Sequence, residues 1–490
     1  MSHVTMSHSE RGTSQVLFNH ARSAVSYTFD EPNLVSAAGL APVMALAQDA
    51  GLADLAEEKI SVRNTGADKG ANAGAKISSL VAGMVAGADS IDDMDLLRHG
   101  GMGSVFDRVY APSTLGSHLR EYTHGHVKQL GSVSSGFLVG LGGRAPLLPV
   151  PAAGDGAGTV FVDIDDTVIE VFSAKKQGAG YGYNSTRGLN GLLVTACTSE
   201  SSPVIIGQQL RKGAAHSARG ADKVLADALG ALKKIPGQDA AVVVRADSAY
   251  YNSKIAGAAA RAGAALSVTV RLDQRIKKTI AEIDDEAWER IEYNNAIFDE
   301  TTGTWVSEAE VAEVPFTAFT SKSEDQQVTG RLIVRRVPEK NAAKLAAGQD
   351  TIFDTYRHHG FFTTISDQTL DTAAADRVHR GHAVIEQVNA ELKAGPLAHM
   401  PSGKFQANAA WLVAAVIAHN LIRATAAVIG GTMARARALT LRSRIISTPA
   451  RIAHRARRLI LHLPTGWKWA KAFDKLWAAA LGPPPAAAST

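Results

Sequence analysis

Three aspartates lie within four positions at the end of an apolar segment, and their types and spacing suit chemistry. They are Asp163, Asp165 and Asp166 in the string FVDIDDTVIE, which begins at Phe161. On an extended strand, Asp163 and Asp165 face one side and Asp166 faces the other. Two neighbouring carboxylates repel each other unless a cation neutralises them. The pair therefore predicts a metal site or a phosphoryl acceptor; a capping role for one aspartate is the structural alternative.

A fourth aspartate, Asp247, ends a second apolar run in the string VVVRADSAYY. In open α/β sheets, functional sites form at the carboxyl ends of strands. Taken alone, Asp247 fits equally well as the N-cap of a following helix.

A third candidate lies in HRGHAVIEQVNAELK, residues 379–393. At 100° per residue, one polar stripe of this predicted helix carries His379, His382, Glu386 and Lys393, opposite an apolar face. A glutamate on such a stripe is commonly just solvated. Flanked by histidine, Asn389 and lysine, and with two strand-end aspartates elsewhere, Glu386 is better interpreted as part of a site.

The elements that must position these acids follow an α/β pattern. Apolar runs predict strands at 159–165, 191–197, 203–210, 240–247 and 265–272, with helices at 219–235 and 252–263. A long helix is expected from about 373 to 393, where Gly395-Pro396 stops it. Strands alternating with helices predict an α/β core with a mixed sheet.

The chain divides into seven segments by composition. We expect a loose N-terminus (1–27), a helical DNA-binding region (28–144), a Pro/Gly/Ala linker (145–158), the first part of the core (159–274), a β-rich insertion (275–365), the second part of the core with the Glu386 helix (366–430), and a basic helical C-terminal region with a tail (431–490). In the first helical region, Gly51 marks a turn between two short helices that loosely resemble a helix-turn-helix.

Composition narrows the class of protein. With 490 residues, 46% hydrophobic and 20% charged, the chain is long and apolar enough for a full-sized core. A single cysteine, Cys197, excludes a disulfide framework and favours a reducing compartment. From Lys404 to Lys475 there are thirteen Lys and Arg residues against one acid, which predicts a polyanionic partner. The apolar stretch 407–431 contains polar residues, so it predicts a core helix rather than a membrane span.

One alternative comes from the first acid string itself. Asp163-Ile-Asp165-Asp166-Thr167 resembles the Asp-x-Asp-x-Thr signature of haloacid-dehalogenase-like phosphatases, which take a phosphoryl group onto the first aspartate. That family also needs a late Gly-Asp-x-x-x-Asp motif for magnesium, and the sequence has none. Its nucleophile usually stands near the start of the domain, whereas a long helical region precedes Asp163 here.

Longer strings closely resemble the DDE transposases of the IS1380 family of bacterial insertion sequences. The similarity runs from about residue 28 to 475 and includes DIDDTVIEVFSAKKQGAGYGYNSTRGLNGLLV, LRKGAAHSARGADKVLADAL, VVVRADSAYYNSKI and HAVIEQVNAELKAGPLAHMPSGKFQANAAWLVAAVIAHNLIR. It implies an RNase H-like mixed-sheet core interrupted by a β-rich insertion, with the acids in the order strand, strand, helix.

The resemblance also implies roles for the acids. The family's first aspartate precedes an x-Thr pair, which selects Asp165, with Asp163 as a possible further metal ligand; the second and third acids match Asp247 and Glu386. Together they would hold two Mg²⁺ or Mn²⁺ ions. The implied reaction is cut-and-paste transposition: cleavage at the element's terminal inverted repeats, then joining of the 3′-OH ends to target DNA.

Contacts to DNA are expected around these acids. Related transposases place Tyr and Arg ahead of the glutamate and Lys after it; Lys393 fits, whereas His379 and His382 replace the other two. Further candidate DNA-binding residues are Lys212, Tyr181, Tyr183, Trp288, Trp305, Arg455, Arg457 and Arg458. Double-stranded DNA is the expected partner, with a homodimer in the synaptic complex, no membrane, and the nucleoid of a bacterial cytoplasm as location. The alternative within this family is a catalytically inactive DNA-binding descendant.

Overall fold

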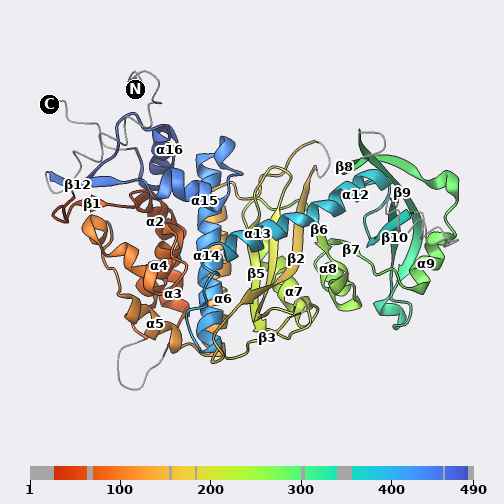
Figure 1. Ribbon diagram of the computed structural model, residues 1–490, viewed down its shortest axis with the longest axis horizontal. Coiled ribbons are helices and arrows are strands. Elements are labelled where there is room, and N and C mark those ends of the chain that lie inside the picture. Colours follow the sequence, from red (N-terminus) through yellow and green to blue (C-terminus); the bar gives the residue numbers. More distant parts are fainter. Residues whose placement is uncertain are drawn as a thin grey trace, which may run out of the picture.

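The structure is a computed structural model in which an elongated molecule places helices at one end, a mixed sheet in the middle and a β-rich extension at the other end (Figure 1). It describes residues 27–62, 70–153, 157–182, 185–299, 304–338, 356–455 and 458–483, and for residues 292–308 it describes no side chain. The expected loose N-terminus lies almost entirely outside this range.

Five strands form the centre of a ten-stranded sheet. They are β2 (Thr159–Glu170), β4 (Arg187–Cys197), β5 (Val204–Lys212), β6 (Ala241–Ala246) and β7 (Ala265–Thr269). Their order is β5-β4-β2-β6-β7, in which β2 is antiparallel to β4 but parallel to β6, and β6 is parallel to β7. The expected mixed α/β fold is therefore present.

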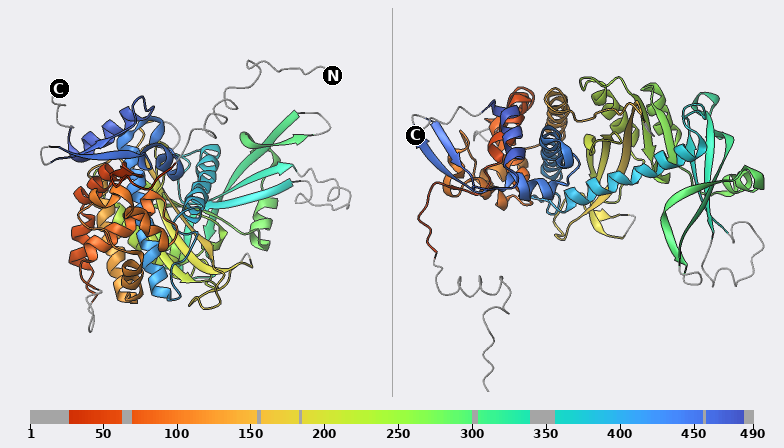
Figure 2. Two further views of the ribbon diagram at one scale, coloured as in Figure 1. Left: turned by 60° about the vertical axis from the view of Figure 1, so that its left-hand side comes forward. Right: turned by 90° about the horizontal axis from the view of Figure 1, so that it is seen from above.

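The β-rich segment continues this sheet. An antiparallel series of β8 (Glu289–Asp299), β9 (Thr304–Ala318), β10 (Val328–Pro338) and β11 (Tyr356–Thr363) joins the core where β11 pairs with β7. In Figure 2 these strands project away from the helical end of the molecule. The short helix α9 (Gln274–Ala281) precedes them.

Helices cover both faces of the core sheet. On one face, α7 (Ala221–Leu232) packs against β5 and α8 (Ser253–Arg261) against β7. The opposite face, which includes Phe161 and Val243, is crossed by α12 (Thr372–Arg380) and α13 (Val384–Lys393). A 3₁₀ turn at Gly381–Ala383 separates these two helices, so the single helix expected from 373 to 393 is a continuous rod with one irregular turn.

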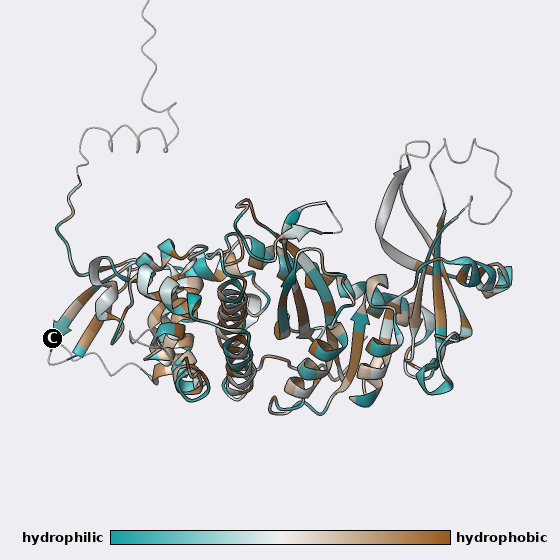
Figure 3. Cartoon of the chain, turned by 90° about the horizontal axis from the view of Figure 1, so that it is seen from below, coloured by the Kyte–Doolittle hydropathy of each residue, from teal (hydrophilic) through white to brown (hydrophobic). Residues whose placement is uncertain are grey.

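A long apolar helix forms the centre of the helical end. The 25-residue helix α14 (Phe405–Ile429) is packed by α4 (Ala73–Ala86) and α6 (His124–Gly142). It is long and apolar enough to cross a membrane, but 89% of its most apolar window is buried inside the protein. It is therefore a core helix, as the polar residues within it predict. Figure 3 shows hydrophobic residues along the interior strands and helices and hydrophilic residues towards the outside.

The remaining N-terminal helices are α2 (Leu40–Asp49), α3 (Leu52–Lys59) and α5 (Pro112–Arg120). Gly51 separates α2 from α3 with a φ of 83°, a left-handed conformation that glycine adopts without strain, which confirms the expected turn.

The C-terminal region contains strands as well as helices. Strands β12 (Ala450–Arg455) and β13 (Arg458–His462) form a hairpin that pairs with β1 (Leu34–Val35), and α15 (Ala438–Leu441) and α16 (Ala470–Leu481) flank it. The wholly helical expectation was wrong here. Basic residues at frequent intervals hid the short apolar alternation, and pairing to a strand more than 400 positions away leaves no local signal.

Candidate active site

The register of the two central strands brings the predicted acids together. Asp163 of β2 lies opposite Arg245 of β6, and Ile164 lies opposite Ala246. One position further, where the pairing of these parallel strands ends, Asp165 and Asp247 are neighbours, on strands about 4.8 Å apart. Asp247 directly follows the carboxyl end of β6, whereas β2 continues past the expected end at 165 to Glu170, because it stays paired with β4. The sheet itself thus pairs the first two acids.

Both carboxylate oxygens of Asp163 accept hydrogen bonds within a buried ion pair. Arg245 donates from Nε to Oδ1 at 2.8 Å and from Nη2 to Oδ2 at 2.7 Å, and His382 Nδ1 lies 3.0 Å from Oδ1. A third hydrogen bond runs from Arg245 Nη1 to the Val378 carbonyl at 2.8 Å. Asp163 has 0% of its surface exposed. Both oxygens are bonded, so Asp163 ties β2 to β6 and to the helix above.

Asp166, on the other face of β2, is neutralised in a different way. The Tyr250 hydroxyl donates to Oδ1 at 2.9 Å, Arg211 Nη2 lies 3.1 Å from Oδ2, and the Asn190 amide also donates to Oδ2. Arg211 is itself fixed by the Ser217 carbonyl at 2.6 Å. This aspartate therefore joins β2 to β4, β5 and the turn after β6.

Asp165 alone of the three has no ion pair within the part of the chain that the structure describes. Its contact is with Asn389 on α13, whose Nδ2 donates to Oδ2 at 3.0 Å. The pKa of the Asp165 carboxyl is raised to about 7, chiefly by burial. The backbone hydrogen bond from Asp166 and the charge of His382 act to lower this pKa, and the charges of Asp166 and Asp247 act to raise it. A half-buried carboxylate that has no ion-pair partner among the described residues is suited to bind a cation.

Asp247 takes the N-cap role that the sequence allowed for it. It is exposed at the end of β6, and its Oδ1 accepts a hydrogen bond from the Ala249 amide at 2.9 Å as the N-cap of a 3₁₀ turn (Ser248–Tyr250). The cap fixes the Asp247 side chain just past the carboxyl end of β6, beside Asp165.

Glu386 lies on α13 above these strands. Its neighbours His382, four residues earlier, and Asn389, three residues later, bond to the two β2 aspartates. Residues at these spacings share a helix face, so Glu386 lies on the face that meets β2. It is exposed. Within the described residues, no three acidic, histidine or cysteine side chains are gathered closely enough to hold a metal, so the expected three-acid cluster is not assembled as the side chains stand.

The ring of His379 holds α12 against the sheet and is not available for contact with DNA. The ring stacks on Phe361 at 4.1 Å with an interplanar angle of 3°, and its two nitrogens lie 2.8 Å from Ser267 Oγ and 3.0 Å from Thr269 Oγ1. Burial lowers the pKa of His379 well below its usual value, so the ring is neutral. Both nitrogens already have partners, and α12 is thereby fixed over β7 and β11.

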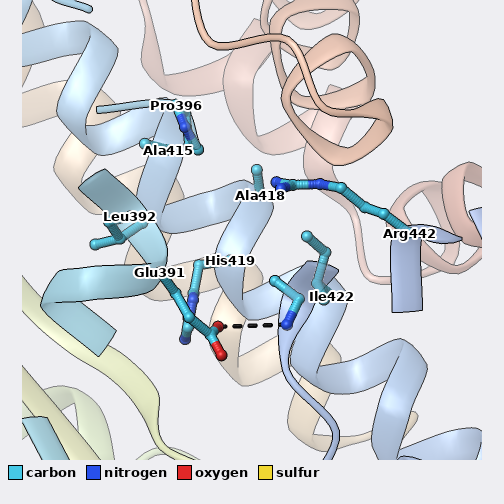
Figure 4. Close-up of a pocket in the computed structure, with 9 residues that line it drawn as sticks. Glu391, Leu392, Pro396, Ala415, Ala418, His419, Ile422 and Arg442 are labelled. Atoms are coloured by element: carbon cyan, nitrogen blue, oxygen red, sulfur yellow. Dashed lines mark hydrogen bonds between the residues drawn. The ribbon is translucent and has the colours of Figure 1, made fainter. Parts of the chain in front are cut away.

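The far end of α13 is held at the junction with the helical region (Figure 4). Glu391 Oε2 accepts from the Ala438 amide at 3.5 Å, beside a void of about 10 Å³ that α14 and Arg442 also line. Arg442 donates to the carbonyls of Met84 at 3.0 Å and Val85 at 3.1 Å, at the end of α4. Helix α13, which carries Glu386, therefore contacts both β2 of the core sheet and the start of α15 in the C-terminal region.

The other candidate DNA contacts around the core differ in accessibility. Lys393, the last residue of α13, and Lys212, the last residue of β5, are exposed, and Tyr181 in the short strand β3 (Gly180–Tyr181) is 69% exposed. Trp288 is half-buried, with the Arg336 guanidinium 4.1 Å from the centre of its ring. Its ring is thus already stacked on one side.

Candidates in the outer segments are only partly described. Arg455 and Arg458 are exposed and lie opposite each other at the end of the β12–β13 hairpin. Tyr183, Arg457 and the side chain of Trp305 lie outside the described residues.

A family model supplies the identification. The model for the transposase DDE domain group 1 matches residues 148–481, from just before β2 to the end of α16. The chain belongs to this family. A search of the curated proteins found no match. DDE transposases act on DNA as nucleases and strand transferases and generally use divalent metal ions.

Sequence reasoning missed the partners of the transposase's acids. Arg245 and Arg211 neutralise two of the three β2 aspartates, yet neither was singled out, and Asn389 was noted only as a neighbour of Glu386. A signal was present, because a charged residue such as Arg245 inside the apolar run VVVRA requires a buried partner of opposite charge.

Proposed function

We propose that this transposase cuts DNA at the terminal inverted repeats of its own insertion sequence and joins the freed 3′-OH ends to target DNA. The supporting observation concerns the three aspartates of β2: arginines neutralise Asp163 and Asp166, whereas Asp165, beside Asp247, has no ion-pair partner among the described residues. The phosphatase alternative needs Asp163 as an accessible nucleophile, and its complete burial in an ion pair argues against that.

We assign the five central strands to an RNase H-like catalytic core. In their order, β5-β4-β2-β6-β7, only β4 is antiparallel to β2; β5, β6 and β7 all run parallel to it. On the basis of the sequence strings quoted in the sequence analysis, we place the chain within the IS1380-type group of transposases.

The donor set suits Mg²⁺ or Mn²⁺. Asp165, Asp247 and Glu386 offer carboxylate oxygens, which hard divalent cations prefer. In the described part of the chain, neither Asp165 nor Asp247 forms an ion pair. When bound, two such ions activate a water or 3′-hydroxyl and stabilise the leaving oxygen of the phosphodiester. Asp163 is not assigned as a ligand, because Arg245 and His382 occupy its oxygens.

The chain's own residues bind and orient the DNA. Lys212, Tyr181 and Lys393 are exposed and suited to phosphate contacts around the acids, while the basic hairpin at Arg455 and Arg458 offers a second contact site. Pairing two transposon ends requires two active sites, so a homodimer on DNA is proposed. The bacterial cytoplasm, at the nucleoid, is the proposed location.

The test is a cleavage assay on a plasmid that carries the reading frame with its flanking inverted repeats. Asp165→Asn, Asp247→Asn and Glu386→Gln should each lower end cleavage by more than about 100-fold, the effect of losing roughly 3 kcal/mol of transition-state stabilisation. Glu282→Gln, an exposed glutamate at the end of α9, is the matched control. If Glu386→Gln cleaves as well as wild type, the assignment fails; DNA binding without cleavage in wild type would indicate the inactive descendant.

A further inference from the structure

The strongest unassigned feature of the site is the side chain of Asn389. It lies on α13 with 7% of its surface exposed, and its Nδ2 donates to Asp165 Oδ2 at 3.0 Å. In the described structure this is the side-chain hydrogen bond that reaches the carboxylate of Asp165, the acid without an ion pair.

The other end of the same amide is unsatisfied. Asn389 Oδ1 is buried and has no hydrogen-bond partner among the described residues. A buried acceptor left without a partner destabilises a fold by about 1–3 kcal/mol, so a purely structural residue at this position would be better apolar. A buried, unpartnered oxygen beside a metal-binding carboxylate points to a donor that arrives with the bound ion.

The helix geometry places this amide in the site. Glu386 lies one turn before Asn389 on the same helix face, and His382, one turn further back, contacts Asp163. Leu392 and Val388, on the adjoining face, are buried in the core and fix the rotation of α13. The amide is therefore held between the third acid and the first.

We propose that Asn389 is a positioning residue of the metal site: its amide nitrogen holds Asp165, and its amide oxygen accepts a hydrogen bond from a water bound to the cation. This inference rests on the proposed function. It assigns Asn389 no direct bond to the metal. Partners of this kind, which orient a ligand, typically change metal affinity by about 10–100-fold when they are removed.

The experiment measures Mn²⁺ binding to the full-length, DNA-free protein by electron paramagnetic resonance, alongside thermal unfolding with and without Mn²⁺. Asn389→Leu removes both ends of the amide and should raise the Mn²⁺ dissociation constant about 10-fold or more. Asn389→Asp keeps an oxygen but places a second carboxylate against Asp165, so Mn²⁺ should raise its unfolding temperature more than it raises that of wild type. Gln387→Ala, an exposed neighbour on α13, should match wild type.

The outcomes separate this inference from the proposed function. If both Asn389 variants bind Mn²⁺ with wild-type affinity and show the wild-type Mn²⁺-induced shift, Asn389 is only structural and the inference is overturned. If wild-type protein binds Mn²⁺ no better than Asp165→Asn does, the metal site itself fails. If Asn389→Leu does not fold, the near-isosteric Asn389→Asp decides the question through its Mn²⁺-induced change in unfolding temperature alone.

Discussion

Arg245 lies directly opposite Asp163 in the parallel register of β6 and β2 and binds both of its carboxylate oxygens. Two positions further along the chain stand Asp247, just past the end of β6, and Asp165, within β2. The same two strands therefore hold a neutralised pair and, next along, a pair that has no ion-pair partner among the described residues. Because side chains alternate across a strand, both pairs point to the face that α12 and α13 cover. The inner pair sets the position of the outer one.

Loss of Arg245 should destabilise the protein strongly. Arg245→Met leaves the Asp163 carboxylate buried without its cation, which typically lowers the free energy of unfolding by about 3–5 kcal/mol. Urea unfolding followed by circular dichroism measures the change. The double variant Asp163→Leu with Arg245→Met removes both charges and should recover most of the loss; equal instability of the single and double variants would contradict an ion-pair role.

The metal-free protein should lose stability as the pH rises from about 4 to about 7. The folded pKa of Asp165 is raised from 3.8 to about 7, so across this window the folded state holds a proton that the unfolded state has released. Each unit by which the pH rises within this window lowers the free energy of unfolding. Above the folded pKa of Asp165, this loss of stability levels off. Melting temperatures measured in chelator across the range should fall less steeply for Asp165→Asn. Mg²⁺ at pH 8 should restore stability to wild type only; parallel curves for the two proteins would refute the assignment.

Gly381 should tolerate no side chain. A Cβ at this position would lie 2.3 Å from Arg245 Nη1, and that guanidinium is fixed by Asp163 and by the Val378 carbonyl. Gly381→Ala must therefore displace Arg245 or lift α13 from β2, and we expect end cleavage to fall about 10-fold or more as Glu386 moves. Gly230→Ala on α7, where a Cβ meets nothing within 4 Å, is the control. Wild-type cleavage by Gly381→Ala would show that the contact relaxes freely.

The basic hairpin should bind DNA through phosphates. Arg455→Ala and Arg458→Ala should each weaken binding to element-end and unrelated DNA alike, and each should reduce the slope of log affinity against log salt by about 1. Fluorescence anisotropy over a salt series measures both quantities. Arg261→Ala, an exposed arginine on α8, should leave the slope unchanged. An unaltered slope in the hairpin variants would place the DNA elsewhere.

Much of the core of this protein could be predicted from local patterns in the sequence. Apolar runs that end on Asp165 and Asp247, and the stripe with Glu386, follow from strand and helix periodicity, which is a property of neighbouring residues. The turn at Gly51 and the burial of α14 follow equally from local residue types. Periodicity failed where pairing is distant: the β12–β13 hairpin depends on β1, at the other end of the chain.

What the sequence by itself determined is which residues are acidic, which face of each element they occupy, and their order along the chain. Only the tertiary structure decided which of the three clustered aspartates has no positive partner in the described part of the chain. That choice depends on Arg245 and Arg211, which lie far from β2 in the sequence and reach it through strand pairing. A carboxylate's charge state is set by what surrounds it in space, so the choice of Asp165 as the proposed metal ligand depends on Asp163 and Asp166 being already neutralised.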